Sequence, residues 1–150
     1  MTHAVEQPRI DWPAAAPDGM KAMMALENAV AAKVDRMLLH LVKLRASQIN
    51  GCAYCIAMHT KEALADGEQI LRLTLLDAWR ESHLYDARER AALAWTEKVT
   101  RIAETQAPRE TYDALAAAFS EEEIGYLTLA IATINAWNRI AIAGRSGHSD

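Results

Sequence analysis

Two cysteines, Cys52 and Cys55, and His59 lie at a spacing that suits thiol redox chemistry. On a helix that turns by about 100° per residue, Cys55 lies about 60° from Cys52 and His59 lies between them, so the three side chains share one face. A helix N-terminus and a neighbouring imidazolium both lower the pKa of a thiol, and the thiolate is the nucleophile. The segment therefore predicts an activated thiolate, a resolving thiol that can close a disulfide, and an acid–base group.

Two other interpretations of these residues stay open. The cysteines could be inert small residues in an Ala-rich helix. Alternatively, Cys52, Cys55, His59 and the upstream His40 could form a four-ligand zinc site. Structural zinc usually serves loops or small domains, whereas a chain of this length can build a core unaided. We therefore favour the redox interpretation and expect neither a metal nor a cofactor.

The composition favours a single all-helical domain that positions this segment. The chain has 150 residues, of which 30 are Ala, 6 are Gly and 4 are Pro. Ala is the strongest helix former, and few helix breakers are present. Apolar residues make up 51% and charged residues 24%, which is ordinary for a globular protein and excludes a disordered chain.

Charge and hydropathy exclude other classes of protein. The net charge is −4 and no basic patch is concentrated in the sequence, so we expect no nucleic-acid partner. No apolar run approaches the ~20 residues of a membrane span, so we expect no membrane partner. The first 17 residues lack the basic and apolar regions of a secretory signal, which predicts a cytoplasmic protein.

The patterning predicts three parts. Residues 1–17 carry three prolines and read as an extended arm with Trp12 as an anchor. Residues 18–143 form the helical domain, and residues 144–150 form a polar, loose tail after Gly144 ends the last helix. Within the domain we expect helices over about 18–33, 36–49, 52–66, 68–78, 87–102, 108–119 and 121–143.

Several other side chains are expected to have structural roles. Asn135, Asn138 and Arg139 interrupt an apolar helix and are expected to hydrogen-bond helix ends or a neighbouring subunit. Tyr54 points away from the thiol face by the same helical arithmetic, which predicts packing in the core or an interface. The three tryptophans at 79, 95 and 137 are expected to be core or interface anchors.

The segment resembles the alkylhydroperoxidase D-like branch of the carboxymuconolactone decarboxylase superfamily. The resemblance rests on Gln48-Ile49-Asn50-Gly51-Cys52-Ala53-Tyr54-Cys55, followed by Met58-His59-Thr60. It extends through Ala78-Trp79-Arg80, Arg88-Glu89-Arg90-Ala91-Ala92-Leu93-Ala94-Trp95-Thr96 and Ile134-Asn135-Ala136-Trp137-Asn138-Arg139-Ile140. It thus covers most of the chain from about residue 20 to 143.

The resemblance implies a compact all-α fold of about six to seven helices that oligomerises through helices as a homotrimer or homohexamer. It also implies a thiol-dependent peroxidase in which Cys55 attacks the hydroperoxide, Cys52 resolves the sulfenic acid and His59 shuttles the proton. A lipoyl-like or thioredoxin-like protein would then reduce the disulfide. A non-turnover redox sensor or scaffold, and a decarboxylase-like lyase, remain the alternative functions.

One position departs from the family pattern. The family commonly places a Glu twelve residues before the first Cys, where it completes a proton relay with the His. This chain has His40 there. We therefore expect a relay that runs through His40 or a water and is altered rather than absent. A helix-surface or satisfied core histidine is the alternative for His40.

Overall fold

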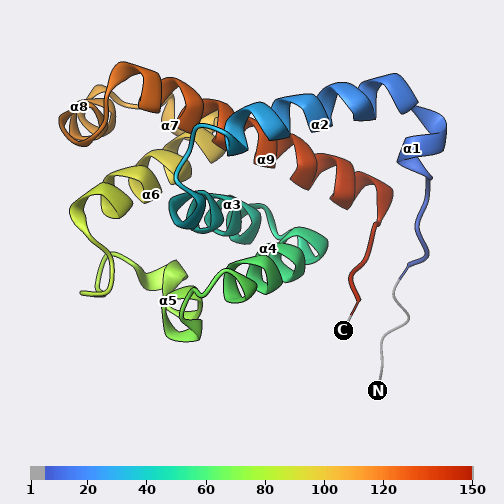
Figure 1. The fold of residues 1–150 in the computed structure, drawn as a ribbon, viewed down its shortest axis with the longest axis horizontal. Helices are drawn as coiled ribbons and strands as arrows, with labels where there is room; N and C mark the ends of the chain where they lie inside the picture. The colour runs from blue at the N-terminus through green and yellow to red at the C-terminus, as the bar shows by residue number, and fades with distance from the viewer. Residues whose placement is uncertain (1–5, 150) are drawn as a thin grey trace.

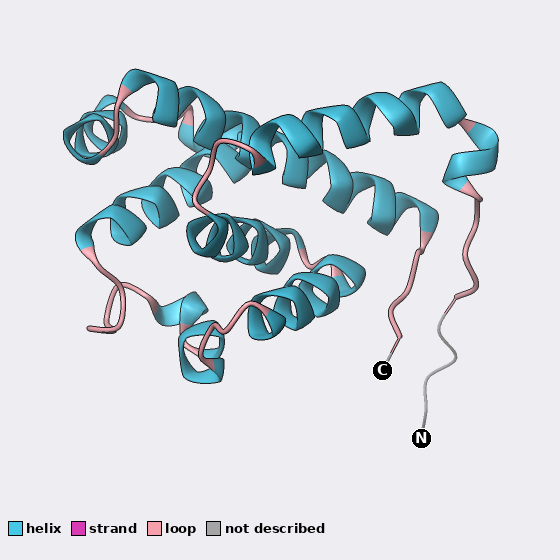
Figure 2. Ribbon diagram, viewed as in Figure 1, coloured by secondary structure: helices cyan, strands magenta, loops and turns pink. Residues whose placement is uncertain are grey.

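The computed structural model describes residues 6–149, which form nine α-helices and one 3₁₀ helix, as Figures 1 and 2 show. The predicted all-α class is confirmed. The helices are α1 (Trp12–Ala15), α2 (Pro17–Ala31), α3 (Arg36–Asn50), α4 (Ala53–Ala65), α5 (Ile70–Thr74), η1 (Leu76–Ala78), α6 (Ala87–Thr100), α7 (Ile102–Thr105), α8 (Arg109–Ala118) and α9 (Glu121–Gly144). The number exceeds the expected six to seven because the helix predicted over residues 68–78 divides into α5 and η1, and because the short helices α1 and α7 are additional.

Helix α3 is the central element of the fold. It packs against α4, α6 and α9 (Figure 1), so ten consecutive residues from Leu38 to Ser47 are buried. Asp35 caps its start, where the side chain accepts the Leu38 backbone N–H at 3.0 Å. Gly51 ends it in the left-handed region at φ +70°, a conformation that Gly adopts without strain. This turn places Cys52 at the start of the next helix.

Two hydrophobic clusters fill the spaces around α3. One is formed with α6, α8 and α9 and includes Trp95, and the other is formed with α4, α5, η1 and α6 and includes Trp79. Both tryptophans are buried, as predicted. Capping boxes begin α6 and α9, the first between Asp86 and Glu89 and the second between Ser120 and Glu123.

The predicted N-terminal arm is not extended throughout. Asp11 accepts the Ala14 backbone N–H at 3.1 Å and Pro13 lies in the first turn, so residues 12–15 form the short helix α1. Residues 1–5 of the arm, with His3, and Asp150 of the tail lie outside the described part of the chain. The described arm and tail descend on the same side of the molecule (Figure 1).

Gly144, which was expected to end the last helix, is the last residue of α9. Arg145 is the left-handed cap, at φ 52°. Gly144 is instead a site of close approach, because a Cβ built there would lie 2.5 Å from the Trp12 indole nitrogen. The Arg9 backbone N–H also donates to the Gly144 carbonyl at 2.8 Å. Trp12 therefore anchors the arm on the end of α9, as predicted.

None of the helices formed by residues 6–149 combines the length and the apolar character that a bilayer crossing requires.

Candidate active site

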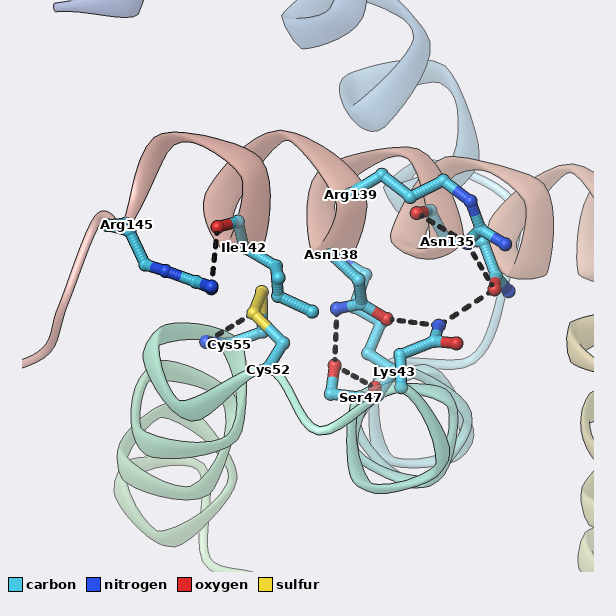
Figure 3. Close-up of a disulfide and its surroundings, with 10 residues drawn as sticks. Lys43, Ser47, Cys52, Cys55, Asn135, Asn138, Arg139, Ile142 and Arg145 are labelled. Carbon is cyan, nitrogen blue, oxygen red and sulfur yellow. Dashed lines mark hydrogen bonds between the residues drawn. A yellow bond between two sulfur atoms is a disulfide. The ribbon is translucent and has the colours of Figure 1, made fainter. Parts of the chain in front are cut away.

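The structure joins Cys52 and Cys55 in a disulfide at the N-terminus of α4, with their Cα atoms 5.3 Å apart. Cys52 is the N-cap residue, and its sulfur accepts the Cys55 backbone N–H at 3.3 Å (Figure 3). Cys55 lies in the first helical turn, where free backbone N–H groups favour negative charge on a side chain. The two thiols are therefore brought together at the position that the spacing predicts.

Both cysteines are only 1% exposed. They pack beneath α9 against Ala141 and Ile142 (Figure 3). Cys52 also lines a small cavity of about 160 Å³, whose other walls include the tail residues Arg145 and Ser146. The disulfide thus lies between α4, the end of α9 and the chain that follows α9.

A buried amide network fixes the turn before the disulfide. Asn50, the last residue of α3, donates its side-chain amide to the Oδ1 atoms of Asn135 and Asn138, both at 2.9 Å (Figure 3). Asn138 in turn donates to the Ser47 hydroxyl at 3.0 Å, and Asn135 donates to Thr100 at 3.1 Å. The expected structural role of Asn135 and Asn138 at a helix end is thus observed.

His59 is a buried, neutral imidazole on the same helix as the cysteines. Its ring is 4% exposed, and Nδ1 lies 3.2 Å from the Glu62 carboxylate. Burial lowers the pKa of His59, and the positive charge of Lys43 lowers it further, against the opposing effect of Glu62. Because Glu62 can only accept, Nδ1 carries the proton and Nε2 is left with a lone pair.

The Nε2 atom of His59 is buried and has no hydrogen-bond partner among residues 6–149. An unpaired buried polar group is costly, and such atoms are typical of catalytic sites. Cys55, one helical turn before His59, is engaged in the disulfide in this state. The free lone pair therefore makes His59 a candidate proton acceptor in the reduced protein.

His59 lines an open cavity of about 600 Å³ whose walls are mainly apolar. Its polar lining includes Glu27, Lys43 and Glu62. The apolar lining includes Trp12, Met20, Met24, Tyr54, Met58 and Trp137. Such a combination of an apolar cavity with a few polar groups is typical of a small-molecule site.

Tyr54 and Trp137 lie at this cavity rather than in a closed core. The Tyr54 ring is 41% exposed and borders both the large cavity and the small one beside Cys52. Trp137 is half-buried and its indole N–H donates to Glu27 at 3.1 Å. Within one chain, the predicted core packing of Tyr54 is therefore not observed.

His40 is directed to a different partner from the one that the family pattern suggested. Its Nε2–H donates to the Asp66 carboxylate at 2.5 Å, and Arg36 binds the other carboxylate oxygen at 2.5 Å. Among the described residues, no hydrogen bond connects His40 to His59. A neighbouring cavity of about 450 Å³ is lined by His40, Asp66, Lys43 and Glu62, among others. The direct His40–His59 relay is therefore absent from this structure.

Sequence reasoning missed three charged residues of the site, namely Glu27, Lys43 and Glu62. Glu62 could have been found, because it lies one helical turn beyond His59. Lys43 stood out as a charge within the apolar run of α3. No local signal marked Glu27, because its partners come from α3 and α9.

A candidate metal centre does not emerge from the geometry. Within residues 6–149, no three His, Cys, Asp or Glu side chains converge in a way that could hold a metal ion. The four residues of the zinc interpretation are divided, because the cysteines bind each other, His59 contacts Glu62 and His40 contacts Asp66.

Comparisons with known proteins agree with this description. The sequence pattern that defines the carboxymuconolactone decarboxylase family matches residues 17–98. An uncharacterized Bacillus subtilis (strain 168) protein, YdfG, is 41% identical over 136 residues, which cover 90% of this chain and 92% of YdfG. A crystal structure of an Agrobacterium tumefaciens protein is also similar to this chain; that protein is described as of unknown function and as a candidate antioxidant defence protein, AhpD. Its sequence is 48% identical to this chain, and the two structures superpose with a TM-score of 0.93 over 96% of this chain and 99% of that one.

A more distant structure shares the fold. The debrominase Bmp8 is 23% identical with a TM-score of 0.79, and the alignment covers 91% of this chain and 74% of Bmp8. A variant of Bmp8 has been crystallised in complex with 2,3,4-tribromopyrrole, with the same identity and TM-score.

Proposed function

Since this chain belongs to the carboxymuconolactone decarboxylase family, in its alkylhydroperoxidase D-like branch, we propose that it is a thiol-dependent peroxidase that reduces organic hydroperoxides. The observation that carries the proposal is the Cys52–Cys55 disulfide at the start of α4, one helical turn before the neutral, buried His59. This arrangement supplies a nucleophile, a resolving thiol and a base on one helix.

The reaction begins from the dithiol. Nε2 of His59 takes the Cys55 proton, and the thiolate attacks the terminal oxygen of the hydroperoxide ROOH. The O–O bond breaks, the alkoxide takes the proton from His59 to leave as ROH, and Cys55 becomes a sulfenic acid. The Cys52 thiol then attacks the Cys55 sulfur and expels water, which closes the disulfide. An external dithiol returns two electrons and two protons.

The position of each cysteine supports the order of attack. Cys55 lies in the first turn of α4, where the helix dipole stabilises a thiolate, and His59 follows it by four residues. Cys52 lies outside the helix as its N-cap and borders the small cavity toward the tail. We therefore assign the peroxide-reactive thiolate to Cys55 and the resolving thiol, which an external dithiol attacks, to Cys52.

The large cavity favours a hydroperoxide with a bulky apolar body. Its volume of about 600 Å³ is larger than hydrogen peroxide requires, and its tryptophan and methionine side chains suit an apolar substrate. We further propose that a lipoyl-like or thioredoxin-like dithiol protein is the reductant, and that the chain assembles into trimers or hexamers. Exposed apolar side chains, among them Ile70, Leu71 and Leu129, support an assembly.

A second candidate function is reductive dehalogenation of an aromatic ring. It rests on the shared fold with a debrominase that binds a brominated pyrrole, and on the aromatic and methionine side chains around the cavity of this chain. In such a reaction the dithiol gives two electrons and one proton to the ring carbon, bromide leaves, the second thiol proton is released to solvent, and the Cys52–Cys55 disulfide closes. Bromide release from tribromopyrrole would separate this activity from peroxidase activity.

The test is consumption of cumene hydroperoxide and hydrogen peroxide with dithiothreitol or dihydrolipoamide as the donor. We expect repeated turnover, a preference for cumene hydroperoxide in kcat/KM, and loss of activity in Cys55→Ser. Without a dithiol donor, Cys52→Ser should consume one equivalent of peroxide and stop at the sulfenic acid. A single oxidation without turnover in the parent protein would instead show a redox sensor, and unchanged thiol counts would exclude peroxide chemistry.

A further inference from the structure

An ion pair between two other helices, with one buried and one partly buried member, lines the same cavity as His59. Lys43 of α3 is 8% exposed, and its ammonium group forms an ion pair with Glu27 of α2. The other carboxylate oxygen of Glu27 accepts the Trp137 indole N–H from α9 at 3.1 Å. Desolvating two charges is costly and is tolerated only with close pairing and further hydrogen bonds, both of which are present here. A plain hydrophobic contact could join the three helices at lower cost, so the pair invites a functional explanation.

We propose that the Lys43–Glu27 ion pair, formed between α3 and α2, sets the electrostatic environment of the His59 ring. The pair thereby takes the role that the family pattern gives to the residue at position 40. Both residues line the same cavity as His59, whereas His40 is held by Asp66. The pair acts through His59 and therefore positions charge rather than touching the reacting atoms. The inference rests on the proposed peroxidase for its role in turnover, but the coupling to His59 is a property of the resting protein.

The two members of the pair act on His59 in opposite directions. The charge of Lys43 lowers the pKa of His59 and that of Glu27 raises it, with the stronger effect from Lys43. Glu62 on α4 also raises it. The remaining titratable groups that line the cavity are Asp11, before α1, and Tyr54 on α4. Burial is the main cause of the lowered pKa of His59; the charge of Lys43 adds to it and favours a ring that can accept the thiol proton, and the charge of Glu27 opposes it.

Because the two charges have opposite effects on the pKa of His59, their removal can be distinguished from a general loss of structure. Lys43→Met and Glu27→Gln break the same ion pair, so they should lower the melting temperature alike. However, the His59 titration should move to higher pH in Lys43→Met and to lower pH in Glu27→Gln, with the larger shift in Lys43→Met. Lys43→Arg keeps the charge and should titrate like the parent.

The measurement is an NMR titration of the histidine ring signals in the oxidised protein, which requires no turnover. His59→Gln identifies the His59 signal among those of the five histidines. The matched control is the exposed ion pair between Lys33 and Glu122, with an N···O distance of 3.1 Å, because Lys33→Met and Glu122→Gln break a pair that does not line the cavity. Both control variants should leave the His59 titration unchanged.

A double variant keeps the test valid if a lone buried charge prevents folding. Lys43→Met with Glu27→Leu removes both charges, and since Lys43 has the stronger effect, His59 should titrate slightly higher than in the parent. Equal titrations in the parent and all folded variants, or shifts of the same sign in Lys43→Met and Glu27→Gln, would overturn the inference.

The peroxide assay separates this inference from the proposed function. In an active enzyme, the acid limb of kcat/KM against pH should follow the His59 titration, upward in Lys43→Met and downward in Glu27→Gln. Opposite NMR shifts with no turnover in any form, the parent included, would support the coupling and reject the peroxidase. Normal turnover with unmoved acid limbs would reject the coupling and support the peroxidase.

Discussion

His40 donates its Nε2–H to Asp66 at 2.5 Å, and Asp66 is the residue that caps the C-terminal end of the helix that carries His59. The contact joins α3 to the far end of α4, and Arg36 reinforces it from the first turn of α3. A residue expected in the proton relay thus connects two helices. The reactive end of α4, with its disulfide, lies about three turns away.

Replacing His40 by Glu should not restore a relay. The new carboxylate would face Asp66, and like charges at this distance should lower the free energy of unfolding by about 1–3 kcal/mol. We expect His40→Glu to melt earlier than His40→Gln, with no gain in peroxide turnover in either variant. Thermal denaturation and the peroxide assay check this. A faster His40→Glu enzyme would place position 40 back in the relay.

Gly144 should tolerate no larger residue while the arm stays in place. A Cβ at this position would lie 2.5 Å from the Trp12 indole nitrogen, so Gly144→Ala should displace the arm and cost about 1–3 kcal/mol of stability. The matched control is Gly125→Ala on the same helix, where a Cβ meets nothing within 4 Å and helix propensity should improve. Hydrogen exchange of residues 9–16 reports the displacement, and equal exchange in both variants would contradict it.

The stability of the protein should fall as the pH drops from about 7 to 5. The pKa of His59 is lowered in the folded protein by burial, and its unfolded value is about 6.5. The unfolded chain therefore takes up the proton first, so stability falls below the unfolded pKa until the folded ring also titrates. Carboxylates with lowered pKa, such as Asp66 with its hydrogen bond from His40, retain their contribution in this window.

Urea unfolding at pH 7.5 and 5.5 measures this effect. We expect the parent protein to lose more stability between the two pH values than His59→Gln, which has no ring to titrate. An equal loss in both proteins would show that His59 is not the group responsible.

The buried amide network should be more important for the disulfide turn than for the core as a whole. Asn138 is fully buried and connects Asn50 to Ser47, so Asn138→Ala should leave polar partners unsatisfied and cost about 2–3 kcal/mol. We also expect faster reduction of the disulfide by dithiothreitol, because Asn50 positions Gly51 and Cys52. The control is Thr133→Val on the same helix, because the Thr133 hydroxyl donates only to the Leu129 carbonyl one turn earlier; it should leave the reduction rate unchanged.

The sequence predicted the features that depend on neighbouring residues. Caps at Asp35, Asp86 and Ser120 mark helix starts because each cap is formed within four residues, and the Cys52–Cys55 spacing defines a disulfide within one turn. The division of the fourth predicted helix at Leu75 was missed, because both pieces have apolar residues at helical spacing.

The charges around His59 could not be predicted in the same way. Glu27 and Lys43 are sixteen residues apart and meet only because α2 and α3 both pack beside α9. His40 was assigned to the relay by its position in the family pattern. Its actual partner, Asp66, is twenty-six residues away, at the opposite end of α4 from the disulfide.

The burial of the disulfide has a kinetic consequence for its reduction. Thiol–disulfide exchange requires the incoming sulfur to approach along the S–S axis, and here Ile142 and the segment from Arg145 to Gly147 border the cavity at Cys52. Because both cysteines are only 1% exposed, we expect the donor to react when this segment moves aside. At high donor concentration the reduction rate should level off at the opening rate of the segment. Raising the concentration of a small free thiol further should then increase the reduction rate very little. A donor that binds the open segment and prolongs its opening gains most.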